Sequence, residues 1–176
     1  MNIRIRKATP ADLQKLQVVM ALTFFNSYKG DADVMDMAIY TQHDLALDKI
    51  KAEMETPGNE FYVLEDLDED VILAYTHLVQ CAEFEGVKPE SGDQLLEVSR
   101  LYVTRGFQGH GFGRQLLDLA EKRAHELGIS GLVLCAWKYN WGGIRFYERE
   151  GFKTVKEMEY PLGHELRPCP VMYKRA

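Results

Sequence analysis

A glycine-rich connection between a strand-like and a helix-like segment constrains the fold of this chain more than any other feature. Residues 95–103, LLEVSRLYV, are mostly apolar and predict a buried strand. Residues 114–127, RQLLDLAEKRAHEL, repeat apolar side chains at helical spacing. Between them, residues 108–113 read QGHGFG, with three glycines at alternate positions. We therefore expect a strand that turns sharply into a helix, within a layered α/β or α+β domain.

The glycine loop also has the composition of an anion-binding site. Glycine lets the backbone approach a ligand closely, and the first amides of a helix are unpaired and lie at its positive dipole end. We therefore predict that a pyrophosphate binds against residues 108–113. A dinucleotide fingerprint would need a third glycine at Arg114, and no P-loop Lys and Ser/Thr pair follows Gly111, so both of those loops are excluded. A glycine turn without a ligand is the alternative.

Composition favours one globular domain over residues 1–176, with 46% hydrophobic and 11% aromatic residues. A net charge of −6 argues against nucleic acid or an anionic membrane surface as a partner and favours positively charged small molecules. No apolar run approaches the roughly 18 residues that cross a bilayer, and no signal-peptide segment begins the chain, so we expect a cytoplasmic protein.

Cysteine and histidine spacing supports neither a disulfide framework nor a metal site. Cys81, Cys135 and Cys169 form no CxxC pair, and the five histidines form no HExxH pair. We expect a mechanism without a metal, with Cys81 and Cys135 as small buried residues.

The rest of the chain predicts alternating strands and helices. Thr9, Pro10 and Asp12 have the pattern that begins a helix, and Thr41 with Asp44 predicts the start of a second one. Residues 26–40 carry no clear pattern, and residues 86–92 predict a polar loop. Asn140 is expected to cap a short helix that ends at Gly151. Strands are predicted at residues 3–7, 61–65, 71–80, 95–103, 131–137, 152–160 and 171–174.

The form Gln-x-x-Gly-x-Gly, preceded by VSRLYV and followed by NWGGIRFYEREGF, resembles the GCN5-related N-acetyltransferases (GNAT). The likeness runs from IRIRKATPADL to VMYKR and is most specific between Glu97 and Phe152. Within the family, LTFFNSYKG, LEVSRLYV and the stretch from AWKYN to FYEREGF are most similar to bacterial spermidine/spermine acetyltransferases of the PaiA type. The resemblance implies a mixed, mostly antiparallel sheet of about seven strands, splayed at strands 4 and 5 and flanked by about four helices.

Two side chains are candidates for proton transfer. An acceptor ammonium with a pKa of about 10.4 is mostly protonated at neutral pH, so a base is useful. Glu97 interrupts an apolar strand, where poor solvation should raise its pKa, and by resemblance it matches the base of GCN5-type histone acetyltransferases. The alternative to a catalytic role is that the Glu97 side chain is exposed to solvent or pairs with Arg100. Tyr147 fits a general acid that returns a proton to the departing thiolate. By resemblance, Asn140 and Tyr147 match the family's Asn and Tyr. The alternative is that Tyr147 is an ordinary aromatic side chain of the core.

The resemblance implies acetyl-CoA as the cosubstrate. An amide within residues 101–103 can stabilise an oxyanion if a bulge turns the strand outward, and by resemblance the Val103 amide binds the pantetheine arm. Arg105, His110 and Arg114 can neutralise phosphates or be ordinary surface residues. Members of the family usually carry helix-forming residues where this chain has Gly142 and Gly143. These glycines predict a helix start that is mobile or that lies close to the cofactor. The residues predicted to bind the cofactor are Leu101, Tyr102, Val103, Gln108, Gly109, His110, Gly111, Phe112, Gly113, Arg114 and Asn140.

These features predict an N-acetyltransferase that moves an acetyl group from acetyl-CoA to a primary amine in a ternary complex. The favoured acceptor is a polyamine such as spermidine or spermine. Acidic residues at positions 31, 33, 36, 44 and 48 can attract a polycation, or they form a solvated face. A peptide or protein N-terminal amine is the enzymatic alternative, and a non-catalytic acyl-CoA sensor is the second, which the presence of Glu97 and Tyr147 disfavours. A homodimer is a possible assembly.

Overall fold

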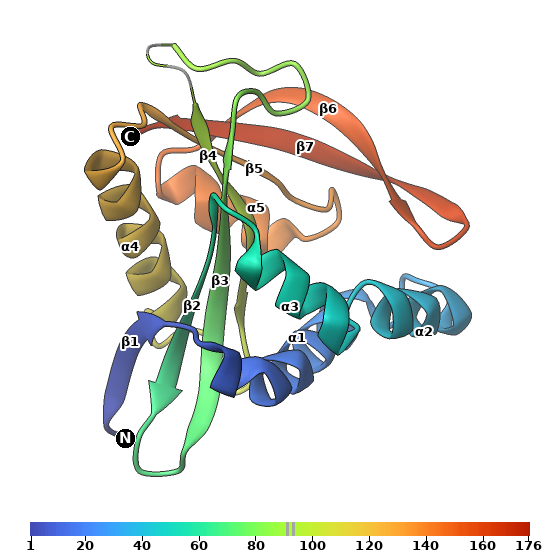
Figure 1. Cartoon of the computed structure of the whole chain (residues 1–176). Helices are drawn as coiled ribbons and strands as arrows, with labels where there is room; N and C mark the ends of the chain where they lie inside the picture. Colours follow the sequence, from blue (N-terminus) through green and yellow to red (C-terminus); the bar gives the residue numbers. More distant parts are fainter. Residues whose placement is uncertain (91, 93) are drawn as a thin grey trace.

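The computed structural model describes residues 1–90, 92 and 94–176, so Ser91 of the predicted polar loop lies outside the described residues. Figure 1 shows the arrangement of the chain. Its elements are β1 (Ile3–Lys7), the 3-10 helix η1 (Pro10–Asp12), α1 (Leu13–Tyr28), α2 (Val34–His43), α3 (Leu47–Glu55), β2 (Asn59–Asp66), β3 (Val71–Cys81), β4 (Leu95–Val103), α4 (Phe112–Glu126), β5 (Gly131–Cys135), α5 (Trp141–Arg149), β6 (Lys153–Leu162) and β7 (Glu165–Arg175).

The strands form one seven-stranded sheet in the order β1-β2-β3-β4-β5-β7-β6. β4 and β5 run parallel, and every other neighbouring pair is antiparallel. The parallel register joins Leu96 to Leu132 and Glu97 to Val133. β4 continues past this register to Val103, whereas β5 ends at Cys135. The predicted mixed, mostly antiparallel sheet, open between its fourth and fifth strands, is confirmed.

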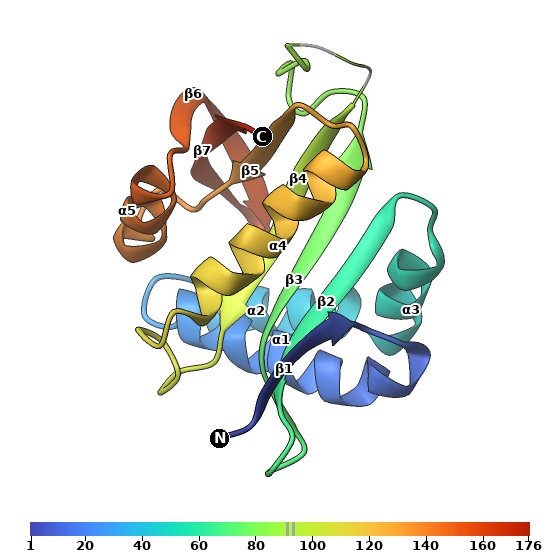
Figure 2. The ribbon, with the colours of Figure 1, turned by 90° about the vertical axis from the view of Figure 1, so that its left-hand side faces the viewer.

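Helices cover both faces of this sheet, as Figures 1 and 2 show. α4 lies across one face, and α5 packs into the same apolar core as α4. α1, α2 and α3 lie on the opposite face. The long hairpin of β6 and β7 ends near α2, where the backbone amide of His164 donates to Asp36 Oδ1 at 3.2 Å. The sheet therefore separates two helical layers, and β4 runs between them.

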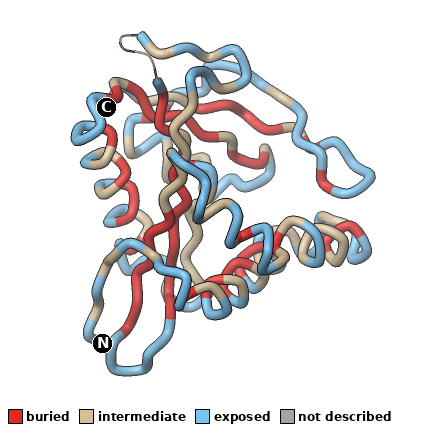
Figure 3. The backbone as a smooth tube through the Cα atoms, in the orientation of Figure 1, coloured by how far each residue is buried: buried red, intermediate tan, exposed pale blue. Residues whose placement is uncertain are grey.

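Each face of the sheet has its own core, and Figure 3 shows the buried residues along the central strands and the inner helix faces. The core on the α4 side includes Leu96, Val98, Leu117, Ala120, Ala124, Leu132 and Phe152. The core on the α1 side includes Leu16, Met20, Phe24, Ile50, Phe61, Val63 and Tyr75. Each fully buried large apolar side chain contributes roughly 1.5–3 kcal/mol to the free energy of unfolding. Apolar burial thus holds both layers against β3 and β4.

The helices at residues 34–55 differ from the prediction. Thr41 was predicted to begin a helix with Asp44, but it lies inside α2, where its Oγ1 donates to the carbonyl oxygen of Met37 at 2.8 Å. Asp33 is the residue that caps α2, because its side chain accepts from the amide of Met35 at 2.8 Å. α3 then begins after Ala46. The Thr41–Asp44 prediction was wrong because a hydroxyl within a helix can bond to the preceding turn instead of capping a new one.

The other predicted starts and ends hold to within a few residues. Asp12 accepts hydrogen bonds from Thr9 N at 2.8 Å and Thr9 Oγ1 at 3.0 Å, and the turn at Pro10 continues directly into α1. β7 is longer than the predicted strand at 171–174, because it pairs with β6 back to Glu165. None of the helices in the described ranges has the length and apolar character needed to cross a membrane.

Candidate active site

The glycine loop bends β4 into α4 and leaves the start of α4 open. Gly109 and Gly111 have φ angles of +82° and +79°, in the left-handed region that glycine adopts without strain. Gly111 is the N-cap of α4, and no heavy atom lies within 4 Å of the position that a Cβ would take there. The first amides of α4 are unpaired within the helix. The loop therefore presents hydrogen-bond donors to an open space.

That open space is a cavity of about 840 Å³, which we call the glycine-loop cavity. It lies between the end of β4, the glycine loop and the start of α5. Among the predicted cofactor residues, those that line it are Leu101, Tyr102, Val103, Gln108, Gly109, Gly111, Phe112, Gly113, Arg114 and Asn140. Arg105 lines it as well. His110 is not among the lining residues: its Nδ1 lies 3.2 Å from the Gln108 carbonyl oxygen, and its ring packs near Phe112.

β4 contributes a free backbone edge to this cavity. The amide of Thr104 donates to Leu73 on β3 at 2.8 Å. Because backbone groups of successive strand residues point to alternate edges, those of Leu101 and Val103 point away from β3. Gln108 Nε2 lies 3.4 Å from the Val103 carbonyl oxygen on that side. The amides of Leu101 and Val103 are therefore directed toward the gap beyond the β4–β5 register.

The expected bulge in β4 is present. Arg100 pairs with His77 and Val98 pairs with Leu78, so Ser99 is the extra residue. The prediction gave the bulge no position and concerned an amide within residues 101–103, which remain in register with β3. The bulge therefore alters the strand between Glu97 and Leu101.

The two glycines at the start of α5 border the same cavity, and only one of them has a clear packing role. Asn140 caps α5 by accepting from the amide of Gly143 at 3.0 Å. A Cβ on Gly143 would lie 2.6 Å from Asn140 Nδ2, so the cap requires glycine there. Gly142 has no heavy atom within 4 Å of its Cβ position, and both glycines line the glycine-loop cavity. The helix start therefore borders the cavity predicted for the cofactor, and its closeness to a bound cofactor stays a prediction.

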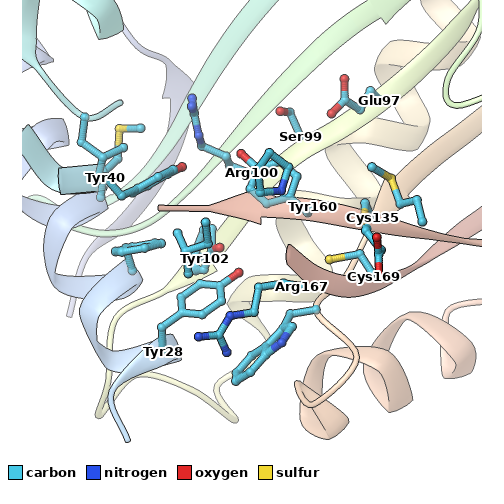
Figure 4. Close-up of a pocket in the computed structure, with 18 of the residues that line it drawn as sticks. Tyr28, Tyr40, Glu97, Ser99, Arg100, Tyr102, Cys135, Tyr160, Arg167 and Cys169 are labelled. Atoms are coloured by element: carbon cyan, nitrogen blue, oxygen red, sulfur yellow. The ribbon is translucent and has the colours of Figure 1, made fainter. Parts of the chain in front are cut away.

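A second cavity, of about 430 Å³, opens on the α1 side of the sheet, and we call it the aromatic cavity (Figure 4). Its aromatic lining comes from separate elements: Phe24, Tyr28, Tyr40, Tyr75, Phe84, Tyr102, Trp137 and Tyr160. β4 also contributes Glu97, Ser99 and Arg100. Tyr102 lines both this cavity and the glycine-loop cavity. The two cavities therefore meet at Tyr102.

Glu97 lies half-buried in the aromatic cavity. Burial raises the pKa of its carboxyl group, and this outweighs the opposing effects of the Ser99 hydrogen bond and the Arg100 charge. Arg100 is engaged elsewhere, because its two terminal nitrogens donate to Glu53 at 2.6 and 3.0 Å. Glu97 is thus a poorly solvated carboxyl group without a close ion pair to Arg100, and it lines a cavity.

Tyr147 lies half-buried on α5 and lines the glycine-loop cavity. Its ring meets Phe152 edge-on at 5.6 Å between centroids. Burial raises the pKa of its phenol well above the ordinary value, so the hydroxyl holds its proton at neutral pH. Glu97 and Tyr147 border different cavities, and Tyr102 stands where those cavities meet.

Sequence reasoning missed two polar side chains of the aromatic cavity, Trp137 and Arg167. They are 6% and 8% exposed, and both line the cavity. Cys135 and Cys169, which also line it, share a thiol hydrogen bond that raises the pKa of Cys135. Arg167 lies between Leu166 and Pro168 on β7, in a polar and proline-containing stretch that lacks the apolar run by which Glu97 was identified. In residues 1–90, 92 and 94–176 there is no cluster of three or more His, Cys, Asp or Glu side chains suited to a metal ion.

Known proteins resemble this chain in sequence and in fold. The model of the acetyltransferase (GNAT) family matches residues 24–152. A protein of Lactobacillus delbrueckii subsp. lactis, named as an uncharacterized N-acetyltransferase in the pepI 3′ region, is 31% identical over 176 residues, which cover 99% of this chain and 98% of that protein.

Two solved structures have the same fold along nearly all of their length. The PaiA N-acetyltransferase of Thermoplasma acidophilum, in complex with coenzyme A, superimposes with a TM-score of 0.78 at 20% identity and 100% coverage of both chains. The putative acetyltransferase yncA of Salmonella typhimurium, with acetyl-CoA, gives a TM-score of 0.68 at 22% identity, with 99% of this chain and 94% of that chain covered.

Proposed function

The chain belongs to the acetyltransferase (GNAT) family, and from this premise we propose that it transfers an acetyl group from acetyl-CoA to a primary amine by direct transfer in a ternary complex. The observation that carries the proposal is the pair of cavities that meet at Tyr102. One presents backbone donors at a helix start, and the other presents the half-buried carboxyl group of Glu97. This arrangement suits two substrates that enter from opposite sides of β4.

The glycine-loop cavity fits the phosphates and the arm of acetyl-CoA. The open Cβ space at Gly111 allows close approach, and the start of α4 favours negative charge. The residues proposed to hold the cosubstrate are the lining residues Leu101, Tyr102, Val103, Gln108, Gly109, Gly111, Phe112, Gly113, Arg114 and Asn140; His110 is proposed only as a neighbouring charge. When bound, acetyl-CoA supplies an acyl group that is activated as a thioester.

Glu97 and Tyr147 are proposed as the proton-transfer groups. Glu97 accepts a proton from the acceptor ammonium, directly or through water, and its raised pKa brings it closer to neutral pH, where a base is efficient. Tyr147 holds its proton because of burial and donates it from its hydroxyl on the cofactor side. The two groups therefore act on opposite sides of Tyr102.

Two acceptor classes have support. The motif resemblance favours a polyamine such as spermidine or spermine, and the carboxylates Glu85, Glu97 and Glu159 in the aromatic cavity suit positive charge. The acidic residues of α2 support this less than expected, because Asp33 caps the helix and Asp36 is buried against His164. The second class is an amino acid or peptide N-terminal amine, which Arg167 in the same cavity favours.

The test is release of free CoA thiol from acetyl-CoA with a panel of polyamines, amino acids and peptides. Turnover with one class supports catalysis and identifies the acceptor. Tight acetyl-CoA binding without turnover on any amine would instead favour the acyl-CoA sensor. Cytoplasmic location and a homodimer remain predictions, and cell fractionation and sedimentation velocity, respectively, would check them.

A further inference from the structure

Two buried hydrogen-bond donors in the aromatic cavity have no partner among the described residues. Trp137 Nε1 and Arg167 Nε are both unpaired within the described part of the chain, although each residue is more than nine-tenths buried. A third unpaired atom, the Tyr173 hydroxyl, belongs to a residue that does not line the cavity and lies near Glu90. Buried polar groups in proteins are almost always satisfied, so two orphan donors in one cavity call for a ligand.

The rest of each side chain is held in place by its surroundings. Arg167 Nη2 donates to the backbone carbonyl of Asp31 at 2.9 Å, and the guanidinium forms an ion pair with Glu165. Its central carbon lies 5.5 Å from the centre of the Trp137 ring. The Trp137 ring in turn packs against Tyr28, with 5.0 Å between ring centres. The Trp137 ring and the Arg167 guanidinium are therefore held beside each other, because their partners fix both groups.

The chemistry of these donors limits what they bind. An indole N–H and a guanidinium N–H both donate and never accept, so the ligand atom must be an acceptor such as oxygen. The guanidinium already pairs with Glu165 through Nη2, and its Nε can donate to a second carboxylate, for which charge-assisted hydrogen bonds are the strongest. Neither Trp137 nor Arg167 lines the glycine-loop cavity, so the acceptor, and not the cosubstrate, is the molecule that reaches them.

The aromatic cavity also carries charged groups of both signs. Glu97 and Arg100 come from β4 and Arg167 comes from β7, and Figure 4 shows Glu97 and Arg167 apart from each other. An acceptor whose amine faces Glu97 can place a carboxylate at Arg167. A polyamine has no oxygen that could accept from these donors.

We propose that Trp137 and Arg167 form a carboxylate subsite for the acceptor, so that the substrate is a zwitterionic amine such as an amino acid or a short peptide. This proposal rests on the proposed acetyl transfer. It assigns to both residues a role in substrate specificity and not in the transfer of the acetyl group. It also predicts that the free donors are satisfied when the acceptor binds.

Matched acceptors test the subsite directly. Lysine and cadaverine differ only by the carboxylate, and a dipeptide can be compared with its C-terminal amide. We expect kcat/KM to be at least about tenfold higher for the carboxylate-bearing member of a pair, the equivalent of one hydrogen bond to a charged group. Calorimetric titration of each acceptor into the protein with CoA bound should show the same preference in Kd.

The variant Trp137→Phe removes one donor and keeps an aromatic ring. We expect KM for the carboxylate-bearing acceptor to rise about tenfold, with no change in KM for acetyl-CoA or for cadaverine. Trp141→Phe is the matched control, because Trp141 is 57% exposed and lies outside both cavities; it should leave all three values unchanged. Arg167→Lys, which keeps the charge but loses Nε, should act like Trp137→Phe.

The outcomes separate this proposal from the proposed function. Transfer to both members of each pair at equal efficiency would overturn the carboxylate subsite and leave the acetyltransferase in place. A preference for spermidine over every carboxylate-bearing amine would overturn it as well and support the polyamine class. Failure of the proposed function gives a different result, namely no CoA release with any amine although acetyl-CoA binds.

Discussion

The two cavities that meet at Tyr102 are built in opposite ways. The glycine-loop cavity takes most of its lining from two short stretches, residues 101–114 and 140–149, and it offers backbone amides and glycine surfaces. The aromatic cavity takes its lining from α1, α2, β3, β4, β5, β6 and β7 and from residues between them, and it offers side chains. The first depends on local backbone geometry, whereas the second depends on the whole fold.

This difference indicates which cavity recognises a feature common to many ligands and which recognises one particular ligand. Backbone amides at a helix start recognise a phosphate whatever side chains surround them. Aromatic rings and buried charges recognise one particular molecule, and they change with a single substitution. We therefore expect substitutions around the glycine loop to affect the use of every acceptor equally, and substitutions in the aromatic cavity to affect acceptors selectively.

The largest expected effect tests the cofactor side at Tyr147. Tyr147→Phe removes the proposed proton donor, and we expect kcat to fall by roughly 10²- to 10⁴-fold for all acceptors. Affinity for acetyl-CoA should change little. Tyr139→Phe is the control, because Tyr139 is 55% exposed and lies outside both cavities. If the loss at Tyr147 comes with an equal loss of thermal stability, its hydroxyl has a structural role instead.

The next effect concerns the glycine loop itself. We expect Gly111→Leu to weaken acetyl-CoA binding by more than about 100-fold, because the new side chain occupies the space at the start of α4. Gly128→Leu is a matched control, since Gly128 also has positive φ and an open Cβ position but lies beyond the other end of α4. Both substitutions place a side chain on a left-handed backbone conformation, so we expect similar decreases in Tm for the two variants. Equal acetyl-CoA affinities in the two variants, measured by calorimetry, would contradict the assignment.

The pH dependence of kcat/KM tests the role of Glu97 on the acceptor side. Because burial raises its pKa, the group is protonated and inactive as a base below that pKa, and kcat/KM should rise with pH as it ionises. In Glu97→Gln we expect a loss of about 10²-fold at pH 7, with partial recovery as the acceptor amine itself deprotonates toward pH values of about 10. A pH profile identical to that of the parent would return Glu97 to a structural role.

Stability gives a second measurement on the same variant. A carboxyl group whose folded-state pKa is raised binds its proton more tightly in the folded protein, so its ionisation lowers the free energy of unfolding as pH rises. Glu97→Gln should therefore be at least as stable as the parent at pH 7. A purely structural carboxylate would instead leave the variant less stable, as urea unfolding would show.

The smallest expected effect is the dependence of KM for the acceptor on salt concentration. If acidic side chains attract a polyamine, KM for spermidine should rise several-fold between low salt and about 0.15 M, because screening acts more strongly on multiple charges. KM for cadaverine should rise less, and KM for a zwitterionic amine should hardly change. Equal salt dependence for spermidine and a singly charged amine would exclude long-range attraction.

The same contrast explains what the sequence could predict. The strand, loop and helix from Leu95 to Glu126 are contiguous, so local spacing located them and most of the residues that this stretch contributes to the glycine-loop cavity. His110 was the exception, because alternate positions in a glycine loop do not fix the direction of the side chain between them. Glu97 was found because a charge in an apolar strand is conspicuous.

The aromatic cavity was not predictable in this way. Trp137 and Arg167 approach each other only because the segment after β5 pairs with β7, where the amide of Lys138 donates to Pro168 at 2.9 Å. The spacing of residues within either segment does not predict that contact. α2 was missed for a related reason, since its buried side includes Met37 and the polar Asp36, whose partner His164 lies far along the chain.

The extra residue at Ser99 makes the pairing of β4 as important as its composition. Side chains alternate between the faces of a strand, so Glu97 and Ser99 share a face, and the bulge brings Arg100 and Tyr102 to the same aromatic cavity. If the same sequence paired with β3 without a bulge, Leu101 would face the acceptor and Tyr102 would face α4. A relative can therefore exchange side chains in this stretch and acquire a new acceptor, but a shift of the bulge past Tyr102 would change the lining of both cavities at once.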